Sequence, residues 1–93
     1  RAAANTIEDW LGMPTILKIG PYRFYFFSHE PNEPPHVHVD RGAATLKCWL
    51  EAVEMAKSRG FRPHEINEIL RMVAEHRDLL LEAWHDYFGS DHR

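Results

Sequence analysis

Apolar side chains in the first two thirds of the chain fall in short runs or alternate with polar ones, a spacing typical of β-strands. The runs 16–19 and 22–27 are separated by Gly20 and Pro21, and this arrangement predicts a β-hairpin. The second run is rich in aromatic residues, which favour a pleated and half-buried surface. The sheet is therefore expected to begin with two antiparallel strands.

A second pair of strands is predicted farther along the chain. Residues 36–40 alternate strictly, and residues 44–50 follow after a turn at Gly42, so these segments are expected to pair in antiparallel fashion. The preceding residues 28–35 contain three prolines and predict a stiff loop. Residues 52–57 are ambiguous, and a short extended piece or a single turn is expected there.

The pattern becomes helical at Pro63, which is favourable as the first residue of a helix. Apolar residues then recur at steps of three and four up to Tyr87, and Gly89 is suited to end the run. One bent helix and two consecutive helices both agree with this spacing.

Together these elements predict an α+β fold, with a small, mostly antiparallel sheet of four to five strands packed against one or two C-terminal helices. The 93 residues suffice for one domain, which is expected to span residues 13–93. Residues 1–12 are expected to be a leader or an extension in front of Met13.

Charge and cysteine content narrow the classes of function. The chain carries 11 basic and 14 acidic side chains, a balance that argues against a dedicated binder of duplex nucleic acid but leaves RNA as a substrate. Cys48 is the only cysteine, so an intrachain disulfide and a thiolate zinc site are excluded and a reducing compartment fits. No apolar run approaches the length of about 20 residues that a membrane span needs. A cytoplasmic protein without membrane contact is predicted.

Histidines provide the candidate chemistry, because three of the seven lie within ten residues. His36 and His38 are two apart on a predicted strand, so their imidazoles share one face and are suited to bind a divalent transition metal such as zinc. His29 is the candidate third ligand if its loop folds over the sheet. Three acidic residues are candidates to orient the imidazoles: Glu30, Glu33 and Asp40.

Proton transfer without a metal is the alternative chemistry. His36 and His38 would then act as acid and base in an RNase-type reaction, with Arg41 neutralising the developing charge. Lys47 or Arg23 are further candidates for that cation, and Tyr25 for stacking a base. A purely structural role, in which the histidines hold the proline-rich loop in place, stays open. Cys48 is expected to be buried and inert, although His38 is a conceivable activating neighbour across the turn.

Four stretches of the sequence resemble a known family. They are Met13-Pro14-Thr15-Ile16, Tyr22-Arg23-Phe24-Tyr25-Phe26, Pro34-Pro35-His36-Val37-His38-Val39 and the run from His76 to Trp84. Over residues 13–88 the chain resembles the bacterial domain of unknown function family numbered 4160, with Pro-Pro-His-Val-His as the most specific element. Residues 1–12 lie outside the family's usual start.

The resemblance implies a short cytoplasmic bacterial protein that forms one half of a toxin–antitoxin-like pair with another small protein. It implies no catalytic residues. The expected function is therefore that of a pair component acting through protein–protein contact, with a partner or as a homo-oligomer, and through the face of His36 and His38. A small metal-binding protein and a metal-independent RNase-type enzyme using the same histidines are the alternatives, and whether the protein is an enzyme stays open.

Overall fold

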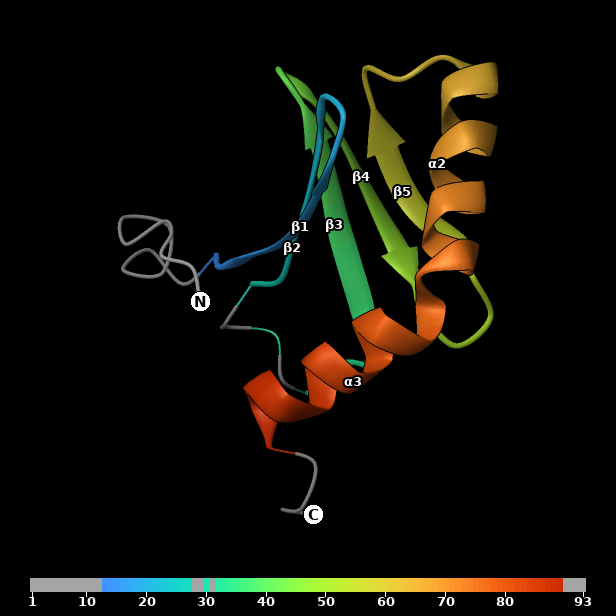
Figure 1. Cartoon of the computed structure of the whole chain (residues 1–93). Helices are drawn as coiled ribbons and strands as arrows, with labels where there is room; N and C mark the ends of the chain where they lie inside the picture. Colours follow the sequence, from blue (N-terminus) through green and yellow to red (C-terminus); the bar gives the residue numbers. More distant parts are fainter. Residues whose placement is uncertain (1–12, 28–29, 31, 90–93) are drawn as a thin grey trace.

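A computed structural model of the chain describes residues 13–27, 30 and 32–89 and has an α+β fold (Figure 1). The elements in chain order are β1 (Thr15–Ile19), β2 (Tyr22–Tyr25), β3 (His36–Arg41), β4 (Ala44–Trp49), β5 (Glu54–Arg59), α2 (Pro63–Glu75) and α3 (Arg77–Phe88). The strands form one sheet in the order β1-β2-β3-β4-β5, and every neighbouring pair is antiparallel. The predicted fold class is confirmed, while the expectation for residues 1–12 lies outside the described residues.

The two predicted strand pairs are confirmed. β1 pairs with β2 around Gly20, and β3 pairs with β4 around Gly42, each glycine having a positive φ that suits a tight turn. The ambiguous segment 52–57 contains both expected elements: residues 52 and 53 belong to a turn, where Val53 has φ 54°, and the remaining residues begin β5. β5 is the last strand of the sheet, and its side chains are almost all exposed.

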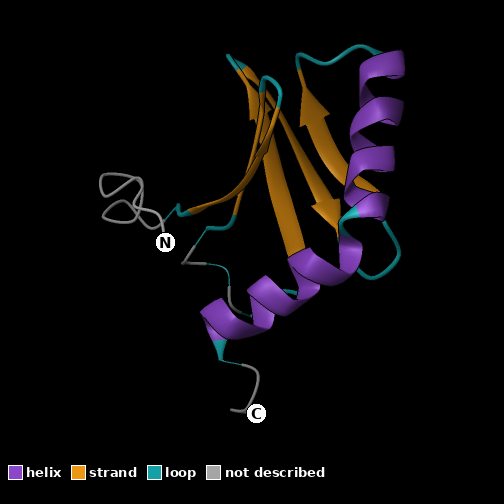
Figure 2. Cartoon of the chain, viewed as in Figure 1, coloured by secondary structure: helices purple, strands orange, loops and turns teal. Residues whose placement is uncertain are grey.

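The helical run divides into two helices at His76. The backbone of His76, with φ −109° and ψ 17°, departs from helical angles and ends α2. Its N–H and its ring Nδ1 both lie near the carbonyl oxygen of Met72, at 3.1 and 2.9 Å. α3 begins directly afterwards and changes direction, so that α2 runs beside the sheet and α3 lies at one end of it (Figures 1 and 2). Within the described part of the chain, neither helix is long and apolar enough to cross a membrane.

One face of the sheet forms the core with the helices. Phe24, Val39 and Leu46 are opposite one another on β2, β3 and β4, and all three are buried. Ile69 of α2 and Leu80 of α3 are fully buried in the same cluster. Each such aliphatic side chain stabilises the fold by about 1.5–3 kcal/mol.

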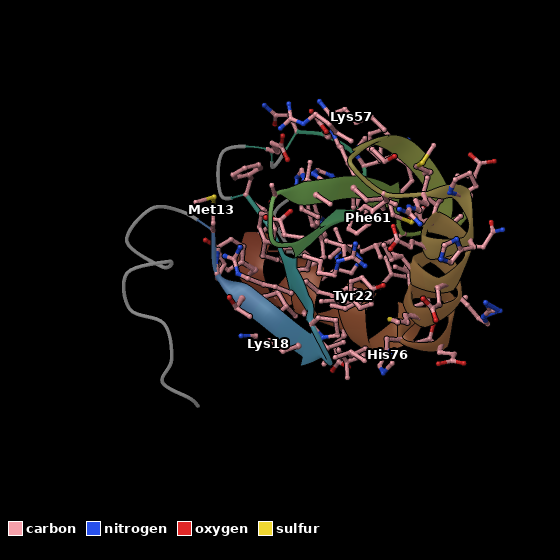
Figure 3. The ribbon with its side chains drawn as sticks, turned by 90° about the horizontal axis from the view of Figure 1, so that it is seen from above. Met13, Lys18, Tyr22, Lys57, Phe61 and His76 are labelled. Carbon is pink, nitrogen blue, oxygen red and sulfur yellow. The ribbon has the colours of Figure 1, made fainter. Side chains whose placement is uncertain are left out.

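The other face of the sheet is polar because side chains alternate along every strand. The strand register places four residues in one row across β2 to β5: Tyr25, His38, Lys47 and Lys57. Figure 3 shows Lys57 on the side of the sheet away from the helices, with Tyr22 and Phe61 on the helical side. The side chains of the candidate histidines therefore project from the sheet face opposite the one that carries Phe24, Val39 and Leu46.

Candidate functional site

A glutamate and two histidines meet at the start of β3. Glu30 Oε1 lies 2.6 Å from His36 Nε2 and 2.9 Å from His38 Nε2. The alternation of β3 points both imidazoles to the polar face, and the loop between β2 and β3 brings Glu30 onto them. The three side chains form the cluster called here the His–Glu cluster.

His36 is held in a fixed orientation. Its side chain is fully buried, and its Nδ1 lies 2.8 Å from the carbonyl oxygen of Pro34. A carbonyl only accepts hydrogen bonds, so Nδ1 carries a proton, a tautomer inferred from the partner. Trp84 of α3 packs against the ring at a centroid distance of 4.9 Å. The Nε2 atom is consequently the one that faces Glu30.

His38 is held between aromatic rings. Tyr25 stacks on its ring at 5.3 Å and Phe27 meets the ring edge-on at 4.6 Å. Burial lowers the pKa of His38, and the hydrogen bond with Glu30 opposes that shift only in part. The imidazole of His38 is therefore neutral at pH 7.

Glu30 is the partly exposed member of the cluster. Burial by itself would raise the pKa of Glu30, but hydrogen bonds from His38 and His36 outweigh it, and the pKa lies below its ordinary value. The carboxyl group is therefore ionised at neutral pH. Its side chain is 25 % exposed, so it has room to move outward from the imidazoles.

The donor set matches what zinc or iron takes in proteins. One ligand atom from each of the three side chains lies within 4.8 Å of the others. Metal–ligand bonds of about 2.0–2.2 Å place tetrahedral ligand atoms about 3.3 Å apart. The Glu30 oxygen lies 2.6 and 2.9 Å from the two Nε2 atoms, so the carboxylate would have to move outward to share a metal ion with them. The contact of His36 Nδ1 with the Pro34 carbonyl is the kind of outer bond that orients a ligating imidazole.

Arg41, one of the residues proposed from the sequence, is not brought to this cluster. Arg41 lies on the opposite face of β3, where its Nη1 is 3.0 Å from Glu65 Oε2 of α2, so its expected proximity to the histidines is wrong. The physical reason is the alternation of the strand, which separates odd from even positions. His29 lies outside the described residues.

The other polar candidates surround the cluster. Lys47 Nζ lies 2.6 Å from Glu33 Oε1, and the same oxygen is 3.8 Å from His36 Nδ1. Arg23 lies over the ring of Tyr25 at 4.2 Å, which agrees with the expectation that β2 and β3 are neighbours. Lys47 and Arg23 are therefore on the face of the histidines.

Asp40 does not orient an imidazole. The Tyr25 hydroxyl donates a hydrogen bond to Asp40 Oδ1 over 3.0 Å. Burial and the neighbouring Asp40 charge raise the pKa of Tyr25 to about 12. This hydroxyl is thus a fixed donor at physiological pH.

Cys48 belongs to the core. It pairs with Val37 on the face opposite the histidines and is fully buried, so His38 is not its neighbour. Burial raises the pKa of the thiol to about 12, and the expectation of an inert cysteine agrees with this position.

Sequence reasoning named Glu30 as a partner that orients the imidazoles but did not predict that one oxygen contacts both, and it missed the two cations of β5, Lys57 and Arg59. Glu30 precedes His36 by six residues across a loop, a separation that no helical or strand periodicity connects. The cations were missed because this segment was left open between an extended piece and a turn, so the direction of its side chains was not predicted. Its pairing with β4 brings Lys57 opposite Lys47 and Arg59 opposite Thr45.

Comparison with known proteins gives one family. A family model described as Domain of unknown function (DUF4160) matches residues 22–85, which confirms the resemblance noted in the sequence. No curated protein and no solved structure matches the chain. Because the match covers most of the chain, the protein belongs to the family described as Domain of unknown function (DUF4160).

Proposed function

We propose that the protein binds one divalent transition metal ion, such as zinc, through Glu30, His36 and His38, and that this metal centre is its functional site. The observation that carries the proposal is the convergence of three ligand atoms within 4.8 Å, two of them on nearly buried imidazoles. Two nitrogens and one carboxylate oxygen leave positions for water or a substrate oxygen, as in catalytic zinc sites.

Hydrogen-bond counting favours a metal over a purely structural cluster. Both ring nitrogens of His36 face oxygen atoms, those of Pro34 and Glu30, at 2.8 and 2.6 Å. A neutral imidazole has one N–H and one lone pair, so one of these two contacts lacks a donor unless His36 or Glu30 carries an added proton, and Glu30 also contacts His38. Burying a charge is costly unless it is well paired. A metal ion removes this cost because each Nε2 then offers a lone pair.

A metal-independent reaction through two histidines has less support. His36 has no exposed surface, so it cannot exchange a proton directly with a substrate. Arg41 points to the opposite face and pairs with Glu65. Only His38 and Glu30 of the cluster line the neighbouring hollow of the polar face.

Metal content of untagged protein tests the proposal. We expect about one equivalent of zinc, iron or manganese per chain and a higher Tm on adding the metal, since free ligand at 100 times Kd stabilises by about 2.7 kcal/mol. Glu30→Gln and His38→Gln are expected to lose both effects, whereas the exposed His64→Gln is the matched control. Less than a tenth of an equivalent, with no shift of Tm, contradicts the proposal.

We also propose, following the resemblance, that the protein is the member of a toxin–antitoxin-like pair that carries this centre. The support is an exposed sheet edge: β5 is the last strand, and Met55 on it is 42 % exposed. Such an edge is suited to contact with a partner protein.

Co-expression with the neighbouring small gene tests this second part. We expect the two proteins to co-elute as one complex. Separate elution of the two proteins at micromolar concentration contradicts the proposed pairing.

A further inference from the structure

A hollow of about 580 Å³ lies on the polar face of the sheet beside the His–Glu cluster. Its lining combines aromatic side chains at one end with cations at the other, namely Tyr25, Phe27, Lys47, Lys57 and Arg59. His38 and Glu30 line the same hollow. A ligand in this hollow therefore reaches the proposed metal centre.

We propose that this hollow binds a strand of single-stranded nucleic acid, with phosphates at Lys57 and Arg59 and a base near Phe27. The inference rests on the proposed function in one respect only: the bound strand would lie next to the proposed metal centre. Binding itself depends on groups outside the His–Glu cluster, and can be measured separately.

The charges of the hollow fit a phosphodiester backbone. Lys57 and Arg59 are exposed, and neither forms an ion pair within the described residues. The acidic side chains of the hollow already have hydrogen-bond partners: Glu30 contacts the two imidazoles, and Asp40 accepts a hydrogen bond from the Tyr25 hydroxyl. The two β5 cations are thus the ones available to an anionic ligand.

The shape of the hollow fits a strand rather than a mononucleotide or a duplex. Tyr25 and Lys57 lie in one row across four strands, and three strand spacings amount to about 14 Å. This distance is longer than one extended nucleotide unit. A cationic groove with aromatic side chains is the usual platform for unpaired bases. The net charge of −3 agrees with a local site and not with a duplex-binding surface.

Fluorescence anisotropy with labelled 12-nucleotide oligouridylate tests the inference, in EDTA and again with zinc. The double variant Lys57→Ser/Arg59→Ser is expected to bind at least about tenfold more weakly and to reduce the salt slope by about 1.4, since each phosphate contact contributes about 0.7 on a single strand. The matched control Lys18→Ser/Arg71→Ser removes the same charge at two exposed positions elsewhere. It is expected to bind within twofold of the wild type.

The affinity for oligothymidylate of the same length is compared with that for oligouridylate. An affinity for the RNA that is equal to or higher than that for the DNA supports the inference. Equal affinities of the two double variants, or tightest binding to a duplex, overturn it. If the protein takes up no zinc at saturating concentration but its nucleic-acid binding depends on Lys57 and Arg59, only the proposed metal centre is contradicted. Metal binding without this dependence contradicts only the present inference.

Discussion

Glu30 Oε1 lies 2.6 Å from His36 Nε2, although Glu30 belongs to a proline-rich loop and His36 begins a strand. The same oxygen also contacts His38. One carboxylate therefore joins the loop to the two imidazoles of β3, and its removal has consequences both for stability and for metal binding.

The first prediction concerns stability without metal. In EDTA, Glu30→Ala leaves two buried N–H groups without their acceptor, and we expect a loss of about 1–3 kcal/mol in the free energy of unfolding. Glu30→Gln keeps one acceptor oxygen and is expected to lose less. Urea denaturation measures both. Glu33→Ala in the same loop removes a partly exposed ion pair with Lys47 and should cost less than about 1 kcal/mol. A larger loss for Glu33→Ala than for Glu30→Ala would contradict this account.

A second prediction concerns the turn after β5. Gly60 has φ +91°, and a Cβ there would lie 3.0 Å from Ala44 Cβ and 3.1 Å from Ala44 Cα. Gly60→Ala is expected to cost about 2–4 kcal/mol from backbone strain and crowding. Gly42→Ala, with φ +60° and no atom within 4 Å of the added Cβ, should cost only about 1 kcal/mol. Thermal or urea unfolding compares the two, and equal losses would be inconsistent with the close approach of Gly60 to Ala44.

Cys48 provides a third prediction, about chemical reactivity. Because burial raises the pKa of its thiol to about 12, the folded protein is expected to react with a thiol reagent at pH 8 only through unfolding. Mass spectrometry of the native protein should show slow modification, and the same measurement in urea should show rapid and complete modification. Rapid modification of the native protein would mean that Cys48 is accessible.

The fourth prediction concerns pH and the ion pair between Arg41 and Glu65. The Arg62 backbone N–H and then the Arg41 guanidinium lower the pKa of the Glu65 carboxyl below its ordinary value of 4.5. Because the pKa of this carboxyl is lower in the folded state, its ionised form stabilises the fold. This stabilisation is complete at pH values above the ordinary pKa and is lost as the pH falls through the folded-state pKa. Wild type should therefore exceed Glu65→Gln in stability at pH 6, and the difference should shrink below about pH 4.5. A difference that stays constant from pH 7 to pH 3 would contradict this assignment.

The strands and helices were predictable where burial imposes a pattern. β3 and β4 alternate because one face of each is buried, and this alternation is visible in the sequence. The segment of β5 stayed open between an extended piece and a turn because its side chains are mostly exposed and so carry no pattern of burial. The break at His76 was also invisible, because helical residues continue on both sides of it.

The site was predictable only in the part that lies within one strand. The shared face of His36 and His38 follows from their spacing, and the same rule would have placed Arg41 on the other face. The contact of Glu30 with both imidazoles depends on the path of the loop in three dimensions. No local rule of spacing predicts such a path.

X-ray absorption at the zinc edge, on protein loaded with one equivalent, tests the proposed metal centre most directly. We expect two imidazole nitrogens at about 2.0–2.1 Å together with oxygen ligands at about 2.0–2.2 Å. One imidazole should disappear from the spectrum of His38→Gln and none from that of His64→Gln. A metal shell made only of oxygen, or the absence of bound zinc at saturating concentration, would contradict the assignment of Glu30, His36 and His38 as ligands.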